Sequence, residues 1–266
     1  MIIEDREISI GFMVSAMRKE SILNYIRDQD VCSVQELSDH FSVSKVTVYR
    51  ILNELASENM VTKIRGGVRI SERSLFEKRF NIRLSTNQKA KEEIAKKAVT
   101  HISEGNSIFI DASTTGYYLA SELARNDSMH LMVISNGPSL ISVFAECPNI
   151  DLILTGGEYQ QYWNSLSGTV ALDAIRKLQF DIAFITAGGV SLDKGVMTSL
   201  SYLLEIATAV LNSAKEVNLI LDSSKFSKVA PLTIAPVSRL RRIISDRGVP
   251  ASTVKQYSEA GIEIEN

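Results

Sequence analysis

The feature that most constrains the fold is a series of five short apolar runs, each followed directly by a cluster of polar residues or glycines. Between the runs, apolar residues recur at helical spacing. Strands that alternate with helices in this way indicate an α/β domain with a mainly parallel sheet. In such sheets, ligands bind at the carboxyl ends of the strands, and all five clusters fall there. The apolar runs cover residues 107–110, 131–134, 152–154, 182–185 and 219–221.

The clusters carry groups that bind phosphates and sugar hydroxyls. Residues 111–115 combine hydroxyls with the free amides of a helix start, Asn136 can both donate and accept, and Lys225 supplies a positive charge. Each loop taken alone is an ordinary strand-to-helix turn, but five at one edge favour a phosphorylated small molecule. The sequence has no Walker loop or GxGxxG fingerprint, so a nucleotide is less favoured. The expected contacts are Asp111, Ser113, Thr114, Thr115, Asn136, Gly156, Gly157, Asp222 and Lys225.

The amino-terminal third is expected to contain three short helices. Residues 18–28 show one apolar helical face. Ser33 with Glu36 three residues later is a capping box, which predicts a second helix over about residues 34–41. After a tight break, Ser44 can cap a third helix.

The third helix is expected to turn a polar and basic face outward. Its apolar positions are spaced for one buried face, which leaves Lys45, Tyr49 and Arg50 outside and Thr47 at the margin. Two short helices joined by a four-residue turn, the second with such a face, have the proportions of a helix-turn-helix over residues 34–53. The apolar positions are Val48, Ile51, Leu52 and Leu55.

Two short β-prone runs follow, flanking Gly66 and Gly67, a pair that permits a tight hairpin. Beside a recognition helix, this hairpin would be a wing whose Lys63 and Arg65 lie along phosphates. Charge supports this interpretation, because residues 43–83 carry nine basic and four acidic side chains, whereas residues 84–266 carry 16 and 19. A basic segment joined to a mildly acidic body is expected where one part meets a polyanion. A solvated charged face is the alternative that charge alone leaves open.

The segment SVQELSDHFSVSKVTVYRILNELASENMVTKIRGGV resembles the DNA-binding domain of DeoR-family bacterial regulators. The family ends its recognition helix with Thr-aliphatic-Arg-Arg-Asp and its wing with Arg-x-His-Gly-Gly. Here Arg50 matches, whereas Tyr49, Ile51 and Arg65 depart from the pattern. Arg65 keeps a positive charge for phosphate contact, but Tyr49 removes a guanidinium able to bind guanine, which changes the expected target sequence. The resemblance implies DNA contacts at Ser33, Ser44, Lys45, Thr47, Tyr49, Arg50, Lys63 and Arg65.

The second half resembles the family's C-terminal sensor domain, which is similar to ribose-5-phosphate isomerase and binds sugar phosphates or related metabolites. The family lysine expected in the helix around residues 205–209 is absent, which favours an effector with one phosphate or a differently placed one. The resemblance thus implies an operator-binding regulator, commonly a repressor of a carbohydrate-utilisation operon, that responds to a phosphorylated sugar. The matching segments are residues 111–115, 135–136, 156–157, 165–168 and 222–226.

An isomerase-like enzyme is the alternative function. Isomerisation of an aldose to a ketose needs a base between adjacent carbons. The loop after residues 182–185 has no carboxylate before Asp193, and Ala207 stands near the position of the expected glutamate, with Glu205 two residues away. The histidines His40, His101 and His130 form no catalytic arrangement in the sequence, which favours a sensor without catalytic or metal chemistry.

Composition and cysteine spacing set the remaining expectations. Cys32 and Cys147 lie far apart without metal-ligand spacing. No apolar run reaches the 18 or so residues of a membrane-spanning helix. We therefore expect a cytoplasmic protein with no cofactor and no membrane partner. Because one helix-turn-helix makes few DNA contacts, a dimer or tetramer on double-stranded operator DNA is expected. The expected organisation is an extension at 1–16, a winged helix-turn-helix at 17–73, a linker at 74–84 and a sensor domain at 85–266.

Overall fold

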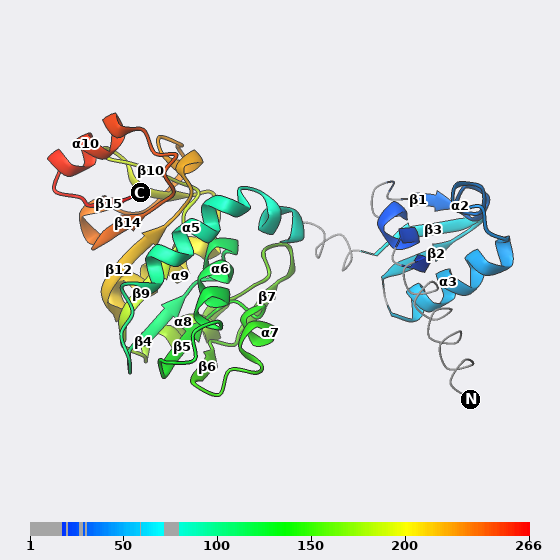
Figure 1. Cartoon of the computed structure of the whole chain (residues 1–266), viewed down its shortest axis with the longest axis horizontal. Helices are drawn as coiled ribbons and strands as arrows, with labels where there is room; N and C mark the ends of the chain where they lie inside the picture. Colours follow the sequence, from blue (N-terminus) through cyan, green and yellow to red (C-terminus); the bar gives the residue numbers. More distant parts are fainter. Residues whose placement is uncertain (1–17, 20, 27–28, 30, 59, 72–79) are drawn as a thin grey trace. The chain divides into compact units, whose positions relative to one another are not determined.

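The computed structural model describes residues 18–19, 21–26, 29, 31–58, 60–71 and 80–266. The chain divides into two compact units, Met1–Asn81 and Ile82–Asn266 (Figure 1). Each unit has a hydrophobic core of its own. The expected extension at 1–16 lies outside the described residues, as do residues 74–79 of the expected linker.

The first unit packs helices against a small antiparallel sheet. Residues 18–19 and 21–26 are helical, α2 spans Val34–Phe41 and α3 spans Lys45–Ser57. The sheet has the order β1-β3-β2, with bounds Val31–Ser33, Gly67–Ile70 and Val61–Ile64.

The predicted helix starts are confirmed. Ser33 Oγ accepts a bond from the Glu36 N–H at 3.1 Å, and the Ser33 N–H donates to the Glu36 carboxylate at 3.3 Å, which completes the capping box. Ser44 Oγ accepts from the Thr47 N–H at 3.2 Å at the start of α3. Ser42, with φ of 52°, makes the left-handed break between the helices. All four apolar positions predicted for α3 are buried.

The expected hairpin forms, but its turn lies one residue earlier than predicted. Ile64 pairs with Gly67, so the turn consists of Arg65 and Gly66, and Gly66 has φ of +81°. Gly67 lies within β3, where β1 passes so closely that a Cβ would stand 2.2 Å from the Cys32 carbonyl oxygen. The pairing of β1 with β3 was not predicted, because three residues are too short for a recognisable alternation.

The second unit is built on a seven-stranded parallel sheet, which confirms the predicted α/β class. Its order is β15-β14-β12-β9-β4-β5-β6. The five apolar runs of the sequence supply its central strands and β6. The strands span Ile264–Glu265, Arg242–Ile244, Ala214–Ile220, Phe180–Ile185, Ser107–Ile110, Leu131–Ser135 and Ile150–Leu154, in sheet order.

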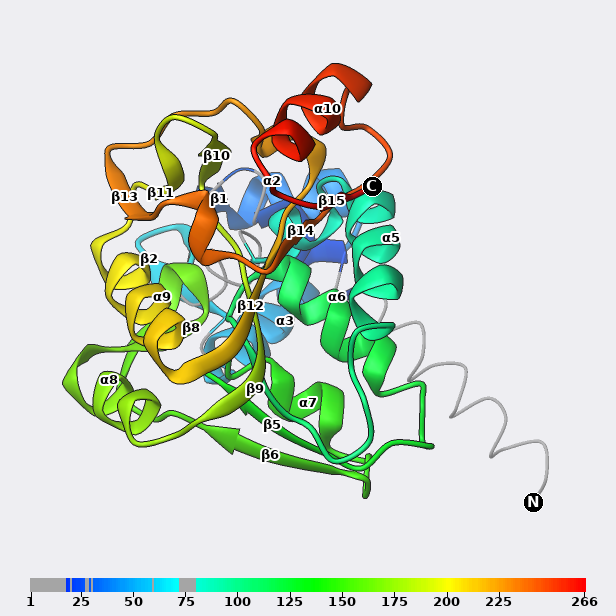
Figure 2. The ribbon, with the colours of Figure 1, turned by 90° about the vertical axis from the view of Figure 1, so that its left-hand side faces the viewer.

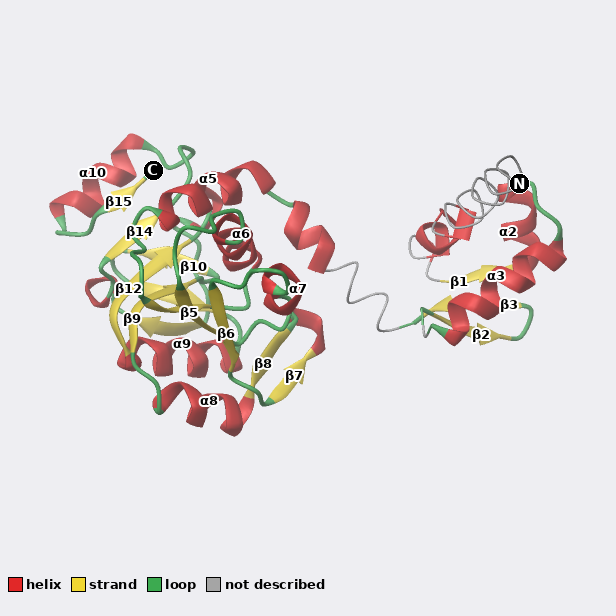
Figure 3. Cartoon of the chain, turned by 60° about the horizontal axis from the view of Figure 1, so that its bottom comes forward, coloured by secondary structure: helices red, strands yellow, loops and turns green. Residues whose placement is uncertain are grey.

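Helices cover both faces of this sheet (Figures 2 and 3). On one face lie α5 (Gln88–Val99), α6 (Thr114–Leu123) and α7 (Leu140–Phe144), and on the other lie α8 (Gly168–Arg176) and α9 (Ser201–Ser213). Because successive strand residues point to opposite faces, Ile108 and Ile110 of β4 join the core under α5 and α6, whereas Phe109 joins the core under α8 and α9.

Short elements complete the unit. A small antiparallel sheet has the order β10-β11-β13, with bounds Gly189–Ser191, Gly195–Thr198 and Leu232–Ala235. Strands β7 (Glu158–Gln160) and β8 (Ser165–Ser167) form a separate ladder. Helix α10 covers Ala251–Glu259, and single 3₁₀ turns cover Gln161–Trp163, Ser223–Lys225 and Val237–Arg239.

The apolar spacing of residues 85–104 predicts one helix that ends at a Gly105 cap, but the structure differs from this prediction at both ends. Residues 80–85 form a separate helical turn, and Asn87, with φ of 53°, interrupts the chain before α5 starts. At the far end, the N–H groups of Thr100 and His101 bond to carbonyls three residues back, so the helix tightens and stops at Val99. Gly105, expected as the cap, lies in the turn before β4.

Within the described residues, no helix combines the length and the apolar character needed to cross a membrane. The same part of the chain contains no group of three or more His, Cys, Asp or Glu that could hold a metal ion.

Candidate functional site

Helix α3 presents a polar and basic face to solvent. Lys45, Tyr49 and Arg50 are exposed, and Thr47 is half-buried at the margin, as the apolar spacing predicted. Val46, which no sequence pattern marked as a contact, is 78% exposed at the first turn of the same helix. An exposed aliphatic group beside basic side chains suits contact with a thymine methyl.

The hairpin places more positive charge on the same unit. Lys63, Arg65 and Arg69 are all exposed, with Arg65 in the turn itself. Ser33 and Ser44 are also exposed, but their hydroxyls are occupied by the capping bonds to the Glu36 and Thr47 N–H groups. These two serines therefore fix where α2 and α3 begin.

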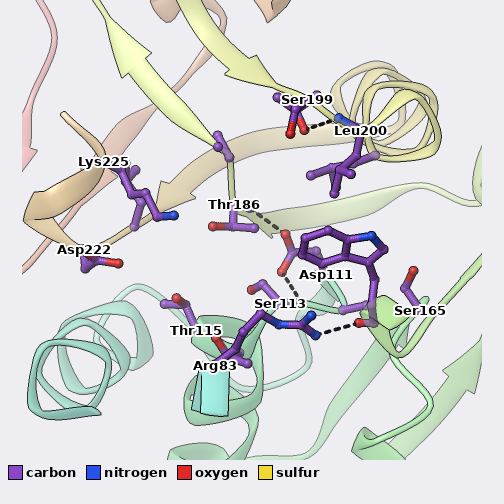
Figure 4. Close-up of a pocket in the computed structure, with 18 of the residues that line it drawn as sticks. Arg83, Asp111, Ser113, Thr115, Ser165, Thr186, Ser199, Leu200, Asp222 and Lys225 are labelled. Carbon is purple, nitrogen blue, oxygen red and sulfur yellow. Dashed lines mark hydrogen bonds between the residues drawn. The ribbon is translucent and has the colours of Figure 1, made fainter. Parts of the chain in front are cut away.

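The second unit contains a cavity of about 530 Å³ at the carboxyl ends of β4, β9 and β12 (Figure 4). Seven of the nine predicted contacts line it, together with side chains that no strand-end motif predicted. The predicted ones are Asp111, Ser113, Thr114, Thr115, Asn136, Asp222 and Lys225, and the unpredicted ones include Arg83, Lys91, Trp163 and Tyr202.

The start of α6 forms one wall of the cavity. Ser113 Oγ caps the helix by accepting from the Gly116 N–H at 2.8 Å. The N–H groups of Thr114 and Thr115, the first helical residues, have no acceptor within the helix. Free amides at a helix start, together with the positive end of the helix dipole, bind anions.

Asp111 holds this helix start against the neighbouring strand. Its carboxylate accepts from the Ser113 N–H at 3.1 Å and from the Thr186 N–H, beyond the end of β9, at 2.6 Å. Burial raises the pKa of Asp111, and these hydrogen bonds act in the opposite direction. Because both carboxylate oxygens already have donors, Asp111 positions the cavity wall.

Asn136 and Asp222 also connect separate segments. Asn136 Oδ1 accepts from the Ala112 N–H at 3.0 Å, and its Nδ2 donates to the Leu166 carbonyl at 3.1 Å. Asp222 accepts from Asn87 Nδ2 at 3.0 Å and from the Ser224 N–H at 3.1 Å, both on Oδ1. Its Oδ2 is therefore the carboxylate oxygen that can accept a ligand hydroxyl.

The cavity is positively charged overall. Its lining includes four cationic side chains and two carboxylates, which gives a net charge of +2 when all are ionised. The cations are Arg83, Lys91, Lys225 and Lys228. Within the described part of the chain, the Lys225 ammonium has no hydrogen-bond or ion-pair partner, and its side chain is labelled at the cavity in Figure 4. Such a group can hold an anion.

Lys91 is a buried cation that the strand-end pattern could not reveal, because it lies within α5. It is 5% exposed, and its ammonium donates to the carbonyls of Arg83, Leu84 and Thr86. Burial lowers the pKa of Lys91 to about 8, with Lys225 and Arg83 acting in the same direction and Asp222 opposing them. The only sign of this burial in the sequence is that Lys91 shares a helix face with the apolar Ile94 and Ala95.

Gly156 and Gly157 do not line the cavity. Gly157 has φ of +109°, and a Cβ there would stand 2.3 Å from the Ser167 carbonyl oxygen. Its lack of a side chain is therefore needed for the packing of β7 and β8. A glycine pair at a strand end has the same appearance in sequence whether a ligand or another backbone approaches it.

The side chains considered for the isomerase alternative lie elsewhere. Glu205 lines a separate surface depression with Arg176 and Thr208, and Ala207 is buried in the core. Asp193 sits beside β10, where it accepts from Ser191 Oγ at 2.8 Å. The two carboxylates that do line the cavity, Asp111 and Asp222, already accept bonds from neighbouring segments. This lining can bind an anion and hydroxyls, and the carboxylates named for the isomerase alternative, Glu205 and Asp193, do not line it.

A winged helix-turn-helix with a basic outer face, followed by an α/β unit with a cationic cavity, defines a DNA-binding regulator with a sensor domain. The DeoR-like helix-turn-helix domain matches residues 18–74, and the DeoR C-terminal sensor domain matches residues 86–247. The chain belongs to the DeoR family of transcriptional regulators, and membership of this family makes it a regulator rather than an enzyme.

Several known proteins are similar over nearly the whole chain. An uncharacterized HTH-type transcriptional regulator of Haemophilus influenzae is 31% identical, covering 95% of this chain and 97% of that protein. The glycerol-3-phosphate regulon repressor of Escherichia coli is 26% identical, covering 95% and 99%, and the lactose phosphotransferase system repressor of Lactococcus lactis is 29% identical, covering 91% and 95%. Ribose 5-phosphate isomerase A of Methanocaldococcus jannaschii is 20% identical with a TM-score of 0.40, covering 53% of this chain and 56% of that one.

Proposed function

We propose that this regulator represses a carbohydrate-utilisation operon and that a phosphorylated sugar or related metabolite in the second unit changes its affinity for operator DNA. The observation that carries the proposal is the combination of free amides at Thr114 and Thr115 with the unpartnered Lys225 ammonium in one cavity. The names of two relatives, repressors of a glycerol-3-phosphate regulon and of a lactose phosphotransferase system, support this class of regulated genes.

On the DNA side, the proposed base and phosphate contacts are the exposed Lys45, Tyr49 and Arg50, with Thr47 beside them. Ser33 and Ser44 would contribute by fixing the starts of α2 and α3, since their hydroxyls act as caps. Lys63 and Arg65 of the wing would contact phosphates. Because one such unit makes few contacts, we propose that a dimer or tetramer binds repeated half-sites.

On the ligand side, a phosphate would bind the amides of Thr114 and Thr115 and the hydroxyls of Ser113 and Thr115. Lys225 would add a charge-assisted contact. Asp222 Oδ2 is suited to accept from a sugar hydroxyl, whereas Asp111 and Asn136 would act by holding the loops in place. Gly156 and Gly157, predicted as contacts from the sequence, would have no direct part.

DNA binding is tested by Arg50→Ala in the full chain. Operator sequences would first be selected from random double-stranded DNA, and affinities then measured by gel shift. Loss of an arginine that binds guanine costs about 1–3 kcal/mol, or about 5- to 150-fold in affinity. Arg125→Ala is the matched control, because Arg125 is a highly exposed arginine of the second unit. Equal affinities for the Arg50→Ala and wild-type proteins would contradict the placement of α3 on DNA.

Ligand binding is tested through Trp163, the chain's single tryptophan, which lines the cavity. Its emission would be titrated with ribose 5-phosphate, glycerol 3-phosphate and inorganic phosphate. We expect at least one of these to change the emission and the operator affinity, and Lys225→Ala to weaken its binding while leaving operator affinity intact. Lys255→Ala, on an exposed lysine of α10, is the control. Absence of any response to all three compounds would refute the proposed class of effector.

A further inference from the structure

The side chain of Arg83 enters the cavity from the part of the second unit that lies nearest in sequence to the DNA-binding unit. Arg83 belongs to the helical residues 80–85, which span the boundary between the two units at Asn81 and Ile82. Only eight residues, 72–79, separate Ser71 at the end of the hairpin from the start of this helix. Residues 80–85 are therefore the part of the sensor unit that continues, along the chain, into the DNA-binding unit.

The backbone of this helix is fixed to the sensor unit at its carboxyl end. The Lys91 ammonium donates to the carbonyls of Arg83, Leu84 and Thr86, and Tyr118 Oη donates to the Leu84 carbonyl at 3.3 Å. Lys91 belongs to α5 and Tyr118 to α6. The helix is thus attached to the two helices that pack beside the cavity, one of which supplies the anion-binding amides.

The Arg83 side chain makes its own contacts across the cavity. Its guanidinium donates to the carbonyls of Tyr162 at 3.0 Å and Trp163 at 3.3 Å, and it lies 4.7 Å from the centroid of the Trp163 ring. Figure 4 shows Arg83 and Lys225 approaching the cavity from different sides. These carbonyl acceptors are neutral, so a phosphate or carboxylate in the cavity would offer the guanidinium stronger, charge-assisted bonds.

We propose that Arg83 binds an anionic group of the effector and thereby couples occupancy of the cavity to the DNA-binding unit. In the arrangement that the structure shows, the guanidinium donates to the Tyr162 and Trp163 carbonyls. In the liganded arrangement, it exchanges them for the effector anion, and residues 80–85 move with it. The coupling depends on this exchange, because a ligand shifts an equilibrium only by as much as its affinity differs between the two arrangements. This inference rests on the proposed function, since it assigns the transmission of the same effector signal.

The test separates binding from coupling in the full-length protein. Affinity for ribose 5-phosphate and glycerol 3-phosphate is measured through Trp163 emission, and operator affinity is measured with and without saturating ester. Allosteric coupling of ordinary strength gives a ratio of about 5- to 150-fold between the two operator affinities in the wild type. For Arg83→Gln at saturating ester, we expect this ratio to approach one, while operator affinity without ester stays within about twofold of the wild-type value. Arg83→Lys, which keeps the charge but not the planar fork, should restore part of the ratio.

Two controls show that the effect belongs to the cavity. Arg239→Gln removes an arginine of the same unit that also bonds to a carbonyl, that of Leu211 at 3.0 Å, but does not line the cavity, and it should leave the ratio unchanged. Lys225→Ala should weaken binding of the ester, yet keep the wild-type ratio once the ester is saturating. A thermal melt of each variant identifies any folding defect.

The outcomes distinguish this inference from the proposed function. If Arg83→Gln keeps the wild-type ratio at saturation, Arg83 is a structural or binding residue only and the coupling assignment is wrong, although the proposed effector class stands. If neither ester binds the wild-type protein, both fall together. As a second readout, hydrogen exchange of the amides in residues 80–87 should change when inorganic phosphate is added to the wild-type protein, but not when it is added to Arg83→Gln. An identical change in both proteins would also overturn the assignment.

Discussion

Asp111→Asn tests whether the buried carboxylate of Asp111 holds the cavity wall together. The two oxygens of this side chain have different donors, since Oδ1 accepts from the Ser113 N–H and Oδ2 from the Thr186 N–H. An amide has one oxygen, so one of these buried N–H groups would face an NH₂ group and lose its acceptor. A buried donor without an acceptor costs about 1–3 kcal/mol. We expect the free energy of unfolding of the second unit to fall by this amount, which corresponds to roughly 2–12 °C in Tm.

Asp222→Asn provides a matched control, because it removes the same charge from the same cavity. Both donors of Asp222 bond to one oxygen, Oδ1, so an amide oriented with its oxygen there keeps both bonds. Its unfolding free energy should therefore change by less than about 1 kcal/mol, because no buried donor loses its acceptor. Urea unfolding at pH 7 followed by Trp163 emission reports the second unit, and an unchanged m-value shows that the two variants share one reference state. Equal losses in both variants, or a larger loss in Asp222→Asn, would refute the reasoning from acceptor geometry.

Three further predictions concern other parts of the molecule. Gly67→Ala should destabilise the first unit by about 1–3 kcal/mol, because its Cβ would overlap the Cys32 carbonyl oxygen, and operator affinity should fall while phosphate-dependent Trp163 emission is retained. The bond from Lys215, with those from Ser107, lowers the pKa of Asp181 to about 2. The ionised Asp181 therefore stabilises the folded state above the ordinary pKa of 3.8, and this stabilisation is lost as pH falls towards 2. Thermal melts of Asp181→Asn and the wild type should converge over that range. Burial lowers the pKa of Lys91 to about 8, so the cost of its buried charge is relieved as pH rises from 8 towards 10.5. The free energy of unfolding of the wild type, measured in urea, should therefore rise relative to that of Lys91→Met between pH 8 and 10. A constant difference between the two proteins would contradict this prediction.

The sequence by itself determined the local elements and their order. The Ser33 and Ser44 caps, the buried stripe of α3 and the apolar runs of the parallel strands depend on residues within a few positions of one another. Helix periodicity and capping are short-range effects, so a single sequence expresses them directly. The position of the wing turn was one residue off, because the fit of Gly67 against β1 depends on a strand 35 residues away.

The tertiary structure alone decided which side chains share the cavity. Arg83, Lys91 and Trp163 lie on three segments that carry no strand-end signature, and they meet because β4 lies between β5 and β9 and β9 lies next to β12 in the sheet. Tertiary packing likewise places Gly157 against Ser167 and not at the ligand cavity. Strand order and packing are set by long-range contacts throughout the core, whereas a local pattern records only the neighbours along the chain. For that reason the sequence predicted an anion-binding edge of the sheet, whereas the contacts of Arg83 are visible only in the folded chain.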